Sequence, residues 1–178
     1  MDVDKCRITH FPAPVLQEAA RPVGEIDDDI RRLVGRMIDV MIEHKGVGLA
    51  APQIGADLRI FIVSIDGTRE NVRVYINPQI KVGGGYESHE EGCLSIPGVF
   101  ANVKRYEKCT VTATDLDGNR FRHEAKGLEV RAFQHEYDHI EGTLIKDRLG
   151  QVQLISVRKQ LRHLREKYEE QKQDSSGA

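Results

Sequence analysis

Residues 135–139 read His-Glu-Tyr-Asp-His, a run whose residue types and spacing could activate a water molecule for hydrolysis. On a helix, positions i and i+4 lie one turn apart on the same face, so His135 and His139 could hold one metal ion. Glu136 would lie about 100° round the helix from His135 and could take a proton from a water beside that ion. The run leaves the third metal ligand open, and that ligand decides the kind of enzyme.

Downstream residues are poor third ligands. A metzincin site continues the run as His-Glu-x-x-His-x-x-Gly-x-x-His, and here Gly142 fits but Ile145 stands where the last histidine is required. A thermolysin-like site takes a carboxylate from a later helix. Glu166 is the first acid of the last predicted helix, and its charged surroundings are typical of a solvated surface. A zincin-type metallopeptidase is therefore an alternative that lacks a convincing third ligand.

Upstream, Cys93 could supply a thiolate. It lies within residues 91–98, Glu-Gly-Cys-Leu-Ser-Ile-Pro-Gly, where the glycines and the proline indicate a strand or loop with close backbone approach. One thiolate and two imidazoles give three protein ligands and leave a fourth position for water, as in a catalytic zinc site. The alternative is an ordinary buried cysteine, and this alternative is favoured for Cys6 and Cys109.

Three helices that would position these residues are predicted from hydrophobic spacing. A core helix follows an N-cap at Asp27 and ends at Gly46, with apolar side chains at i, i+3, i+4 and i+7. A second helix, residues 128–141, carries the His-Glu-Tyr-Asp-His run. A third has apolar residues at near-heptad spacing over residues 154–168, and the polar tail 171–178 is expected to be disordered.

Strands are predicted between the core helix and the motif helix. Residues 72–76 favour a strand that ends at Asn77-Pro78. Residues 109–114 and 121–125 flank Asp117-Gly118, which is a strong hairpin signal. The pattern is typical of an α+β fold, with antiparallel β-sheets packed around the central His-Glu-x-x-His helix, an N-terminal core helix and a C-terminal helix.

Chain length indicates one domain, expected over residues 1–170, which would contain the catalytic residues. The net charge is -2 at pH 7, which gives no general attraction to DNA or to an anionic membrane. Apolar runs are too short to span a bilayer, and the N-terminus lacks the features of a signal peptide. The three cysteines form no paired framework. A cytoplasmic protein is expected, with a processed organellar protein as the alternative.

A third segment completes a pattern. Residues 46–53, Gly-Val-Gly-Leu-Ala-Ala-Pro-Gln, would alone indicate only a connecting turn. Together with residues 91–95 and 134–142 they resemble peptide deformylases. That family carries Gly-x-Gly-x-Ala-Ala-x-Gln, Glu-Gly-Cys-x-Ser and Gln-His-Glu-x-Asp-His-x-x-Gly in this order, and this chain has all three. Ile140 stands where the family usually has leucine, a volume-conserving change.

The resemblance implies metal-dependent removal of the N-formyl group from the N-terminal formyl-methionine of nascent polypeptides, with release of formate. The implied metal ligands are Cys93, His135 and His139. The implied ion is Fe(II) in cells, with zinc, nickel or cobalt as alternatives in purified protein, and it lowers the pKa of its bound water from about 15.7 toward 7. Glu136 would serve as base and then acid, while the Gln53 side chain and the Leu94 backbone N–H would stabilise the oxyanion.

The resemblance also implies how the substrate is held. Gly48 would pair with the extended substrate backbone. The expected walls of the methionine pocket are Val47, Leu128 and Ala132. Glu91 and Arg105 resemble an ion pair that steadies the cysteine loop, with an ordinary surface pair as the alternative. Arg131 is a departure from an apolar pocket wall, and its stem is expected to lie along the rim.

The last predicted helix suggests a macromolecular partner. Its basic residues are Arg158, Lys159, Arg162, Arg165 and Lys167. In members of the family this helix is implicated in docking near the ribosomal exit tunnel, which is anionic RNA. The mixed charges of the helix could equally form a solvated face. A non-catalytic ribosome-binding metal protein is a further alternative, which four filled metal positions would favour.

Overall fold

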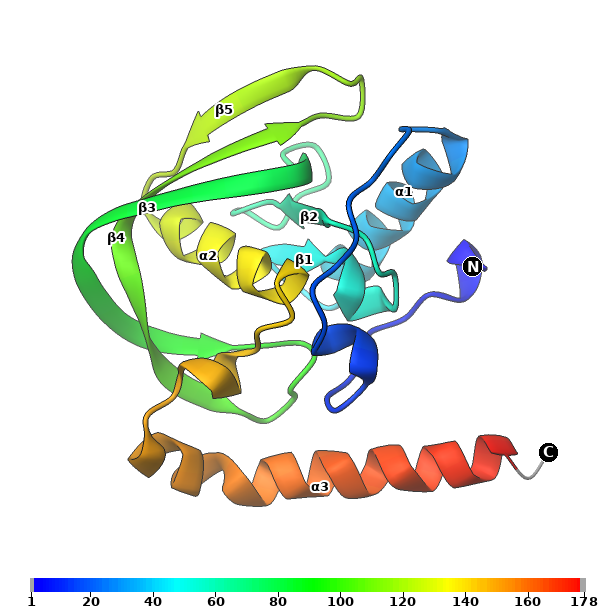
Figure 1. Ribbon diagram of the computed structural model, residues 1–178, viewed down its shortest axis with the longest axis vertical. Coiled ribbons are helices and arrows are strands. Elements are labelled where there is room, and N and C mark those ends of the chain that lie inside the picture. Colours follow the sequence, from blue (N-terminus) through cyan, green and yellow to red (C-terminus); the bar gives the residue numbers. More distant parts are fainter. Residues whose placement is uncertain (1, 177–178) are drawn as a thin grey trace.

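A computed structural model describes residues 2–176, and side chains through residue 173. The expected α+β architecture is confirmed, and the strands form one antiparallel sheet in the order β1-β2-β3-β4-β5. The strands are β1 (Gly48–Ala50), β2 (Ile60–Val63), β3 (Arg73–Gly92), β4 (Phe100–Thr114) and β5 (Arg120–Glu124). The α-helices within the described residues are α1 (Asp28–Glu43), α2 (Leu128–Ile140) and α3 (Gln151–Ser176). Short 3-10 helices connect them. The long strands β3 and β4 curve around α2, while α3 runs along the end of the molecule opposite β5 (Figure 1).

The rotation of α2 about its axis is set by its contacts with the sheet. Phe133 is fully buried against Phe61 and Tyr75, with ring centroids 6.0 Å and 5.0 Å away. Burying such a side chain contributes about 1.5–3 kcal/mol. His135 and His139 follow Phe133 by two and six positions, which is close to the opposite face of a helix. Packing of Phe133 therefore turns both histidines away from this aromatic cluster.

Helix α1 begins as the sequence predicts. The Asp27 carboxylate accepts a hydrogen bond from the Ile30 N–H at 2.9 Å, which satisfies a donor at the helix start. Its buried face consists of Leu33, Val34, Met37, Val40 and Met41. The helix ends at Glu43, and a turn through Gly46 passes the chain directly into β1.

Strand β3 does not end at Asn77-Pro78, so that prediction is wrong. The pairing of β3 with β4 shifts register between Ile76 and Gln79 and then continues to Gly92. A proline is tolerated at such an irregularity because no ladder hydrogen bond is required of it there. Asn77 adopts a left-handed φ of 49°, and its side chain forms two 2.8 Å hydrogen bonds with the Val23 backbone. The predicted β4–β5 hairpin is confirmed.

Helix α3 is longer than the sequence predicts. It continues as a helix through residues 171–176, where disorder was expected, and residues 177–178 of that tail lie outside the described residues. The expected apolar stripe is confirmed, and its buried members are Val157, Leu161 and Leu164. Among the described residues, no helix combines the length and the apolar composition that crossing a bilayer requires.

Candidate metal and substrate site

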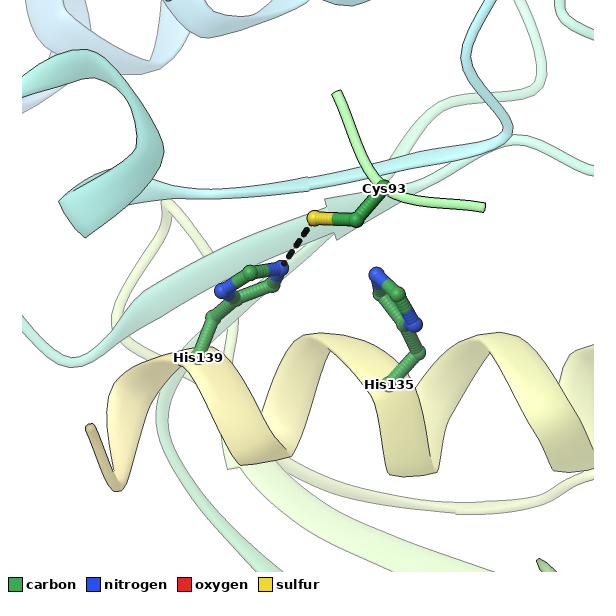
Figure 2. Close-up of side chains that lie close together, drawn as sticks. All are labelled: Cys93, His135 and His139. Carbon is green, nitrogen blue, oxygen red and sulfur yellow. Dashed lines mark hydrogen bonds between the residues drawn. The ribbon is translucent and has the colours of Figure 1, made fainter. Parts of the chain in front are cut away.

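Three side chains converge, one from the segment that follows β3 and two from α2. Cys93 follows the end of β3, while His135 and His139 lie one turn apart on α2 (Figure 2). Their ligand atoms all lie within 4.8 Å of one another, and the Cys93 Sγ is 3.2 Å from the His139 Nε2. The sulfur therefore faces two imidazoles, which is not the surroundings of an ordinary buried cysteine. This geometry fits the ligand set that the sequence suggested.

The charges of this cluster favour the ligating form of the cysteine. Burial by itself would raise the pKa of the Cys93 thiol, but the imidazoles of His139 and His135 outweigh it and hold that pKa well below its usual value. Burial would likewise lower the pKa of His135, yet its hydrogen bonds with Cys93 and Glu91 raise it. Thiolate is the form of cysteine that binds metals.

Glu91 orients His135 from behind. The His135 Nδ1 lies 3.0 Å from the Glu91 Oε2, so the Nε2 is the nitrogen left to face Cys93. Arg105 donates two hydrogen bonds to the same carboxylate, at 2.9 Å and 3.0 Å. The two side chains are only 4% and 6% exposed, so the alternative of an ordinary surface pair is wrong. Burial would raise the pKa of Glu91, but His135 and Arg105 keep it far below its ordinary value.

Arg131 also binds the Glu91 carboxylate. Its Nη1 donates to the Glu91 Oε1 at 2.6 Å and to the Val103 carbonyl at 3.1 Å. The side chain also lines the cavity described below. The guanidinium is therefore held by an ion pair with Glu91. Sequence reasoning missed this ion pair because β3 and α2 are far apart along the chain.

Asp138 was also missed as a contributor to the site. Its carboxylate accepts hydrogen bonds from Arg105 at 2.5 Å and from Arg148. Arg105 thus links the Glu91 carboxylate, which binds His135, to Asp138, which immediately precedes His139 on α2. Removing one partner of such a buried pair leaves an uncompensated charge, at a cost of about 3–5 kcal/mol. The aspartate within the His-Glu-Tyr-Asp-His run was the available sequence signal.

Glu136 is held beside the metal-ligand cluster in a nearly dry position. It is 4% exposed, and its Oε2 has no hydrogen-bond partner within the described structure. Burial raises the pKa of Glu136 to about 7. Gly48 lies directly against this side chain, because a Cβ at Gly48 would come within 2.5 Å of the Glu136 Oε1. The missing side chain at Gly48 therefore makes room for the carboxylate.

Gln53 is oriented by its own backbone. Its Oε1 accepts the Ala50 N–H at 2.8 Å, which turns the Nε2 toward the Ser95 Oγ at 3.4 Å and the Cys93 Sγ at 3.7 Å. The amide donor thus points at the cluster. Ser95 is fully buried, and its part in holding Gln53 was not predicted from the sequence.

A cavity of about 540 Å³ is bordered by Gln53, Cys93, His135 and Glu136. The predicted pocket walls all line it, and they are Val47, Leu128 and Ala132. Leu94 lies at its border as well. Further along the rim are three residues that sequence reasoning did not identify, His10, His44 and Lys45. The cavity size is typical of a small-ligand site.

The donor set suits a borderline transition metal. One thiolate with two imidazoles is a ligand set for zinc, iron, cobalt or nickel and leaves a coordination position open. The buried Glu136 Oε2 without a partner fits a site that receives a further polar group. The residues present therefore fit a bound divalent ion.

Replacing Cys93 by Ser should weaken cobalt binding at least about tenfold and change the absorption of the cobalt-substituted protein, because a soft thiolate is exchanged for a poorly ligating hydroxyl. The measurement is a cobalt titration followed by visible absorption. Cys6→Ser is the matched control, since Cys6 lies outside the cluster, and it should keep the wild-type spectrum. An unchanged spectrum for Cys93→Ser would rule out Cys93 as a ligand.

Three convergent side chains that could ligate a metal, beside a buried carboxylate at the border of a cavity, match the active-site arrangement of metallohydrolases. The family model described as polypeptide deformylase matches residues 5–154 of this chain. The chain therefore belongs to the peptide deformylase family, and it is an enzyme of the hydrolase class.

Relatives and solved structures agree with this assignment. The peptide deformylase of Alkalilimnicola ehrlichii is 40% identical over 156 residues, which cover 86% of this chain and 87% of that protein. Peptide deformylase 1 of Clostridium perfringens is 48% identical over 75% of this chain and 90% of that one. A crystal structure of the plant peptide deformylase PDF1B superposes with a TM-score of 0.89 at 36% identity, covering 94% of this chain and 92% of the other.

Proposed function

We propose that this enzyme hydrolyses the N-formyl group from the N-terminal formyl-methionine of nascent polypeptides and releases formate. The observation that carries the proposal is the convergence of three distant segments on one cavity. Residues 46–53 supply a backbone edge and the Gln53 amide, residues 91–95 supply the thiol, and α2 supplies two imidazoles and a carboxylate. Family membership gives the substrate class.

Different groups of the site would bind the metal, transfer the proton and stabilise the oxyanion. A divalent ion held by Cys93, His135 and His139 would supply Lewis acidity, which activates a water and polarises the formyl carbonyl. The Glu136 carboxylate takes a proton from the attacking water. The same carboxylate then gives that proton to the departing amine. The Gln53 Nε2 and the Leu94 N–H donate to the oxyanion that develops.

The substrate is held by backbone pairing. β1 pairs with β2 on one side and is the edge strand of the sheet, so Gly48 can pair with an added extended peptide. The methionine side chain enters the part of the cavity bounded by Leu128 and Ala132. Val47 and Leu128 are 36% and 51% exposed, so binding of an apolar side chain would cover apolar surface.

Fe(II) is the proposed ion in cells, with zinc, nickel or cobalt as alternatives in purified protein. A ferrous thiolate site should lose activity on exposure to oxygen. The proposed location is the cytoplasm. An organellar location is the alternative, because a chloroplastic deformylase 1B of Oryza sativa is 37% identical over 168 residues, although this chain spans only 62% of that protein.

The test is anaerobic purification, metal analysis and an assay with a formyl-Met peptide. Formate release from the formyl peptide, with no release of acetate from its acetyl-Met counterpart, is the expected result. A peptide with the same residues but an internal scissile bond tests the zincin alternative. Cleavage of that peptide without deformylation would refute the proposal, and metal binding without any turnover would favour a non-catalytic metal protein.

We also propose that α3 docks on ribosomal RNA. The five basic residues named above on this helix are all exposed and lie outside the buried stripe, and Arg158, Lys159 and Arg162 are the three nearest its start. Deleting residues 155–178 would remove the buried Val157 and Leu161, so charge neutralisation is the cleaner test.

Replacing Arg158, Lys159 and Arg162 together by Gln should weaken co-sedimentation with ribosomes and reduce the slope of log affinity against log salt by about 2–3. Replacing Glu166, Glu169 and Glu170 by Gln is the matched control and should strengthen binding. Equal co-sedimentation of all three proteins would show that α3 is only a solvated face.

A further inference from the structure

Lys45 lies two residues after the end of α1, in a conformation that a lysine disfavours. Its φ is 55°, in the left-handed region. The Lys45 N–H donates to the Ile42 carbonyl at 3.0 Å, and the Gly46 N–H donates to the Met41 carbonyl at 2.9 Å. Glycine or asparagine is the usual residue at the left-handed position of such a helix end. Helix termination alone therefore does not explain a lysine here.

Lys45 lines the cavity, and its ammonium group can contact a bound molecule. It lines the rim with His10 and His44, immediately before the segment that would pair with substrate. No ion-pair partner of Lys45 is found among residues 2–173. Arg131, the other permanent cation of the cavity, is bound to Glu91. Lys45 is thus the uncompensated cation of this rim within the described residues.

The direction of the substrate follows from burial. On the C-terminal side of Gly48, Leu49, Ala50 and Ala51 are completely buried, so a peptide cannot leave that way. It must run from the reacting group beside Glu136 past Val47 and Gly46 toward Lys45. Lys45 is three residues from Gly48, which is at most about 10 Å along the chain. A methionine opposite Val47–Gly48 places the third residue of the peptide near Lys45.

Resting on the proposed deformylase function, we infer that Lys45 is a specificity-determining residue that favours an acidic side chain at the third position of the formylated peptide. The contact lies at an exposed rim, so solvent screens it and the expected preference is modest. Glu90 lines the cavity from β3, and its carboxylate repels an acidic side chain that approaches it instead of Lys45.

The test compares kcat/KM for formyl-Met-Ala-Asp-Ala-amide with that for its Asn counterpart. Wild type should favour Asp about threefold to tenfold at low salt, and the ratio should approach one at about 1 M salt, where the screening length is about 3 Å. Moving the Asp to position two should give a smaller ratio.

Two variants of Lys45 separate charge from structure. Lys45→Asn should bring the Asp to Asn ratio to about one without lowering the melting temperature, because asparagine tolerates the left-handed conformation. Lys45→Glu should invert the ratio and favour formyl-Met-Ala-Lys-Ala-amide. Lys108→Met, which removes an exposed lysine on β4, is the matched control and should keep the wild-type ratio.

The inference would be overturned if wild type turned over the Asp and Asn peptides equally well, or if Lys45→Asn left the Asp to Asn ratio of kcat/KM unchanged. Turnover of the Asn peptide in either case would leave the proposed function intact. A preference confined to position two would overturn it as well. Absence of turnover with every formyl peptide would refute the proposed function itself.

Discussion

Replacing Glu136 by Gln should lower kcat/KM for a formyl-Met peptide by about 10²–10⁴-fold while the metal content stays at the wild-type level. The substitution preserves shape but removes the group that would accept and return the proton. It leaves Cys93, His135 and His139 untouched. The measurement is formate release under saturating metal, with metal content determined on the same sample.

The same substitution should not destabilise the protein. The Glu136 carboxylate is buried, and one of its oxygens has no partner in the described structure, so ionising it in the fold is unfavourable. A folded-state pKa of about 7, above the ordinary 4.5, means that the metal-free fold binds the proton more tightly than the unfolded chain does. The free energy of unfolding of metal-free wild type should therefore fall, relative to that of Glu136→Gln, as the pH rises from 4.5 to about 7.

Glu141→Gln is the matched control for Glu136→Gln. Glu141 follows the same helix but pairs with Arg59 in a partly exposed ion pair outside the cavity. Its replacement should keep deformylation within about twofold of wild type, since exposed pairs contribute little. Substantial residual turnover by Glu136→Gln would remove Glu136 as the proton-transfer group.

The parts of the site that are adjacent in sequence could be predicted from the sequence. The i, i+4 spacing of His135 and His139 on an amphipathic helix requires only helix geometry. Cys93 could be proposed because its flanking glycines and proline are unusual and because its segment matches a family pattern. In each case local chemistry or a matched motif contained the information.

The supporting contacts could not be predicted because they join segments that only the fold brings together. His135 and Glu91 are 44 positions apart, and Arg105 and Asp138 are 33 apart. The continuation of β3 beyond Pro78 has the same origin, since pairing with β4 overrides the local signal. The left-handed φ of Lys45 is likewise invisible in a sequence, because lysine gives no signal for it.

The absence of a side chain at Gly48 leaves the space that the Glu136 carboxylate occupies. Replacing Gly48 by Ala should reduce kcat/KM by roughly 10²-fold, the effect of misplacing a reacting group by about 1 Å. The added Cβ would lie 2.5 Å from the Glu136 Oε1 and 2.9 Å from its Cγ. Glu136 is buried, so its side chain cannot move aside freely. Gly35→Ala, in the middle of α1 with nothing within 4 Å, is the control and should keep activity.

A double-mutant cycle can show whether Gly48→Ala acts through Glu136. If the alanine only displaces the carboxylate, adding Gly48→Ala to Glu136→Gln should change kcat/KM by less than about threefold, because the displaced proton-transfer group is already absent. If the alanine instead obstructs peptide pairing along β1, the two losses should multiply, and KM should rise in both backgrounds. The contact distances favour the first outcome, since the Cβ meets Glu136 before any other side chain. Wild-type activity of Gly48→Ala would show that the position of the carboxylate does not depend on this glycine.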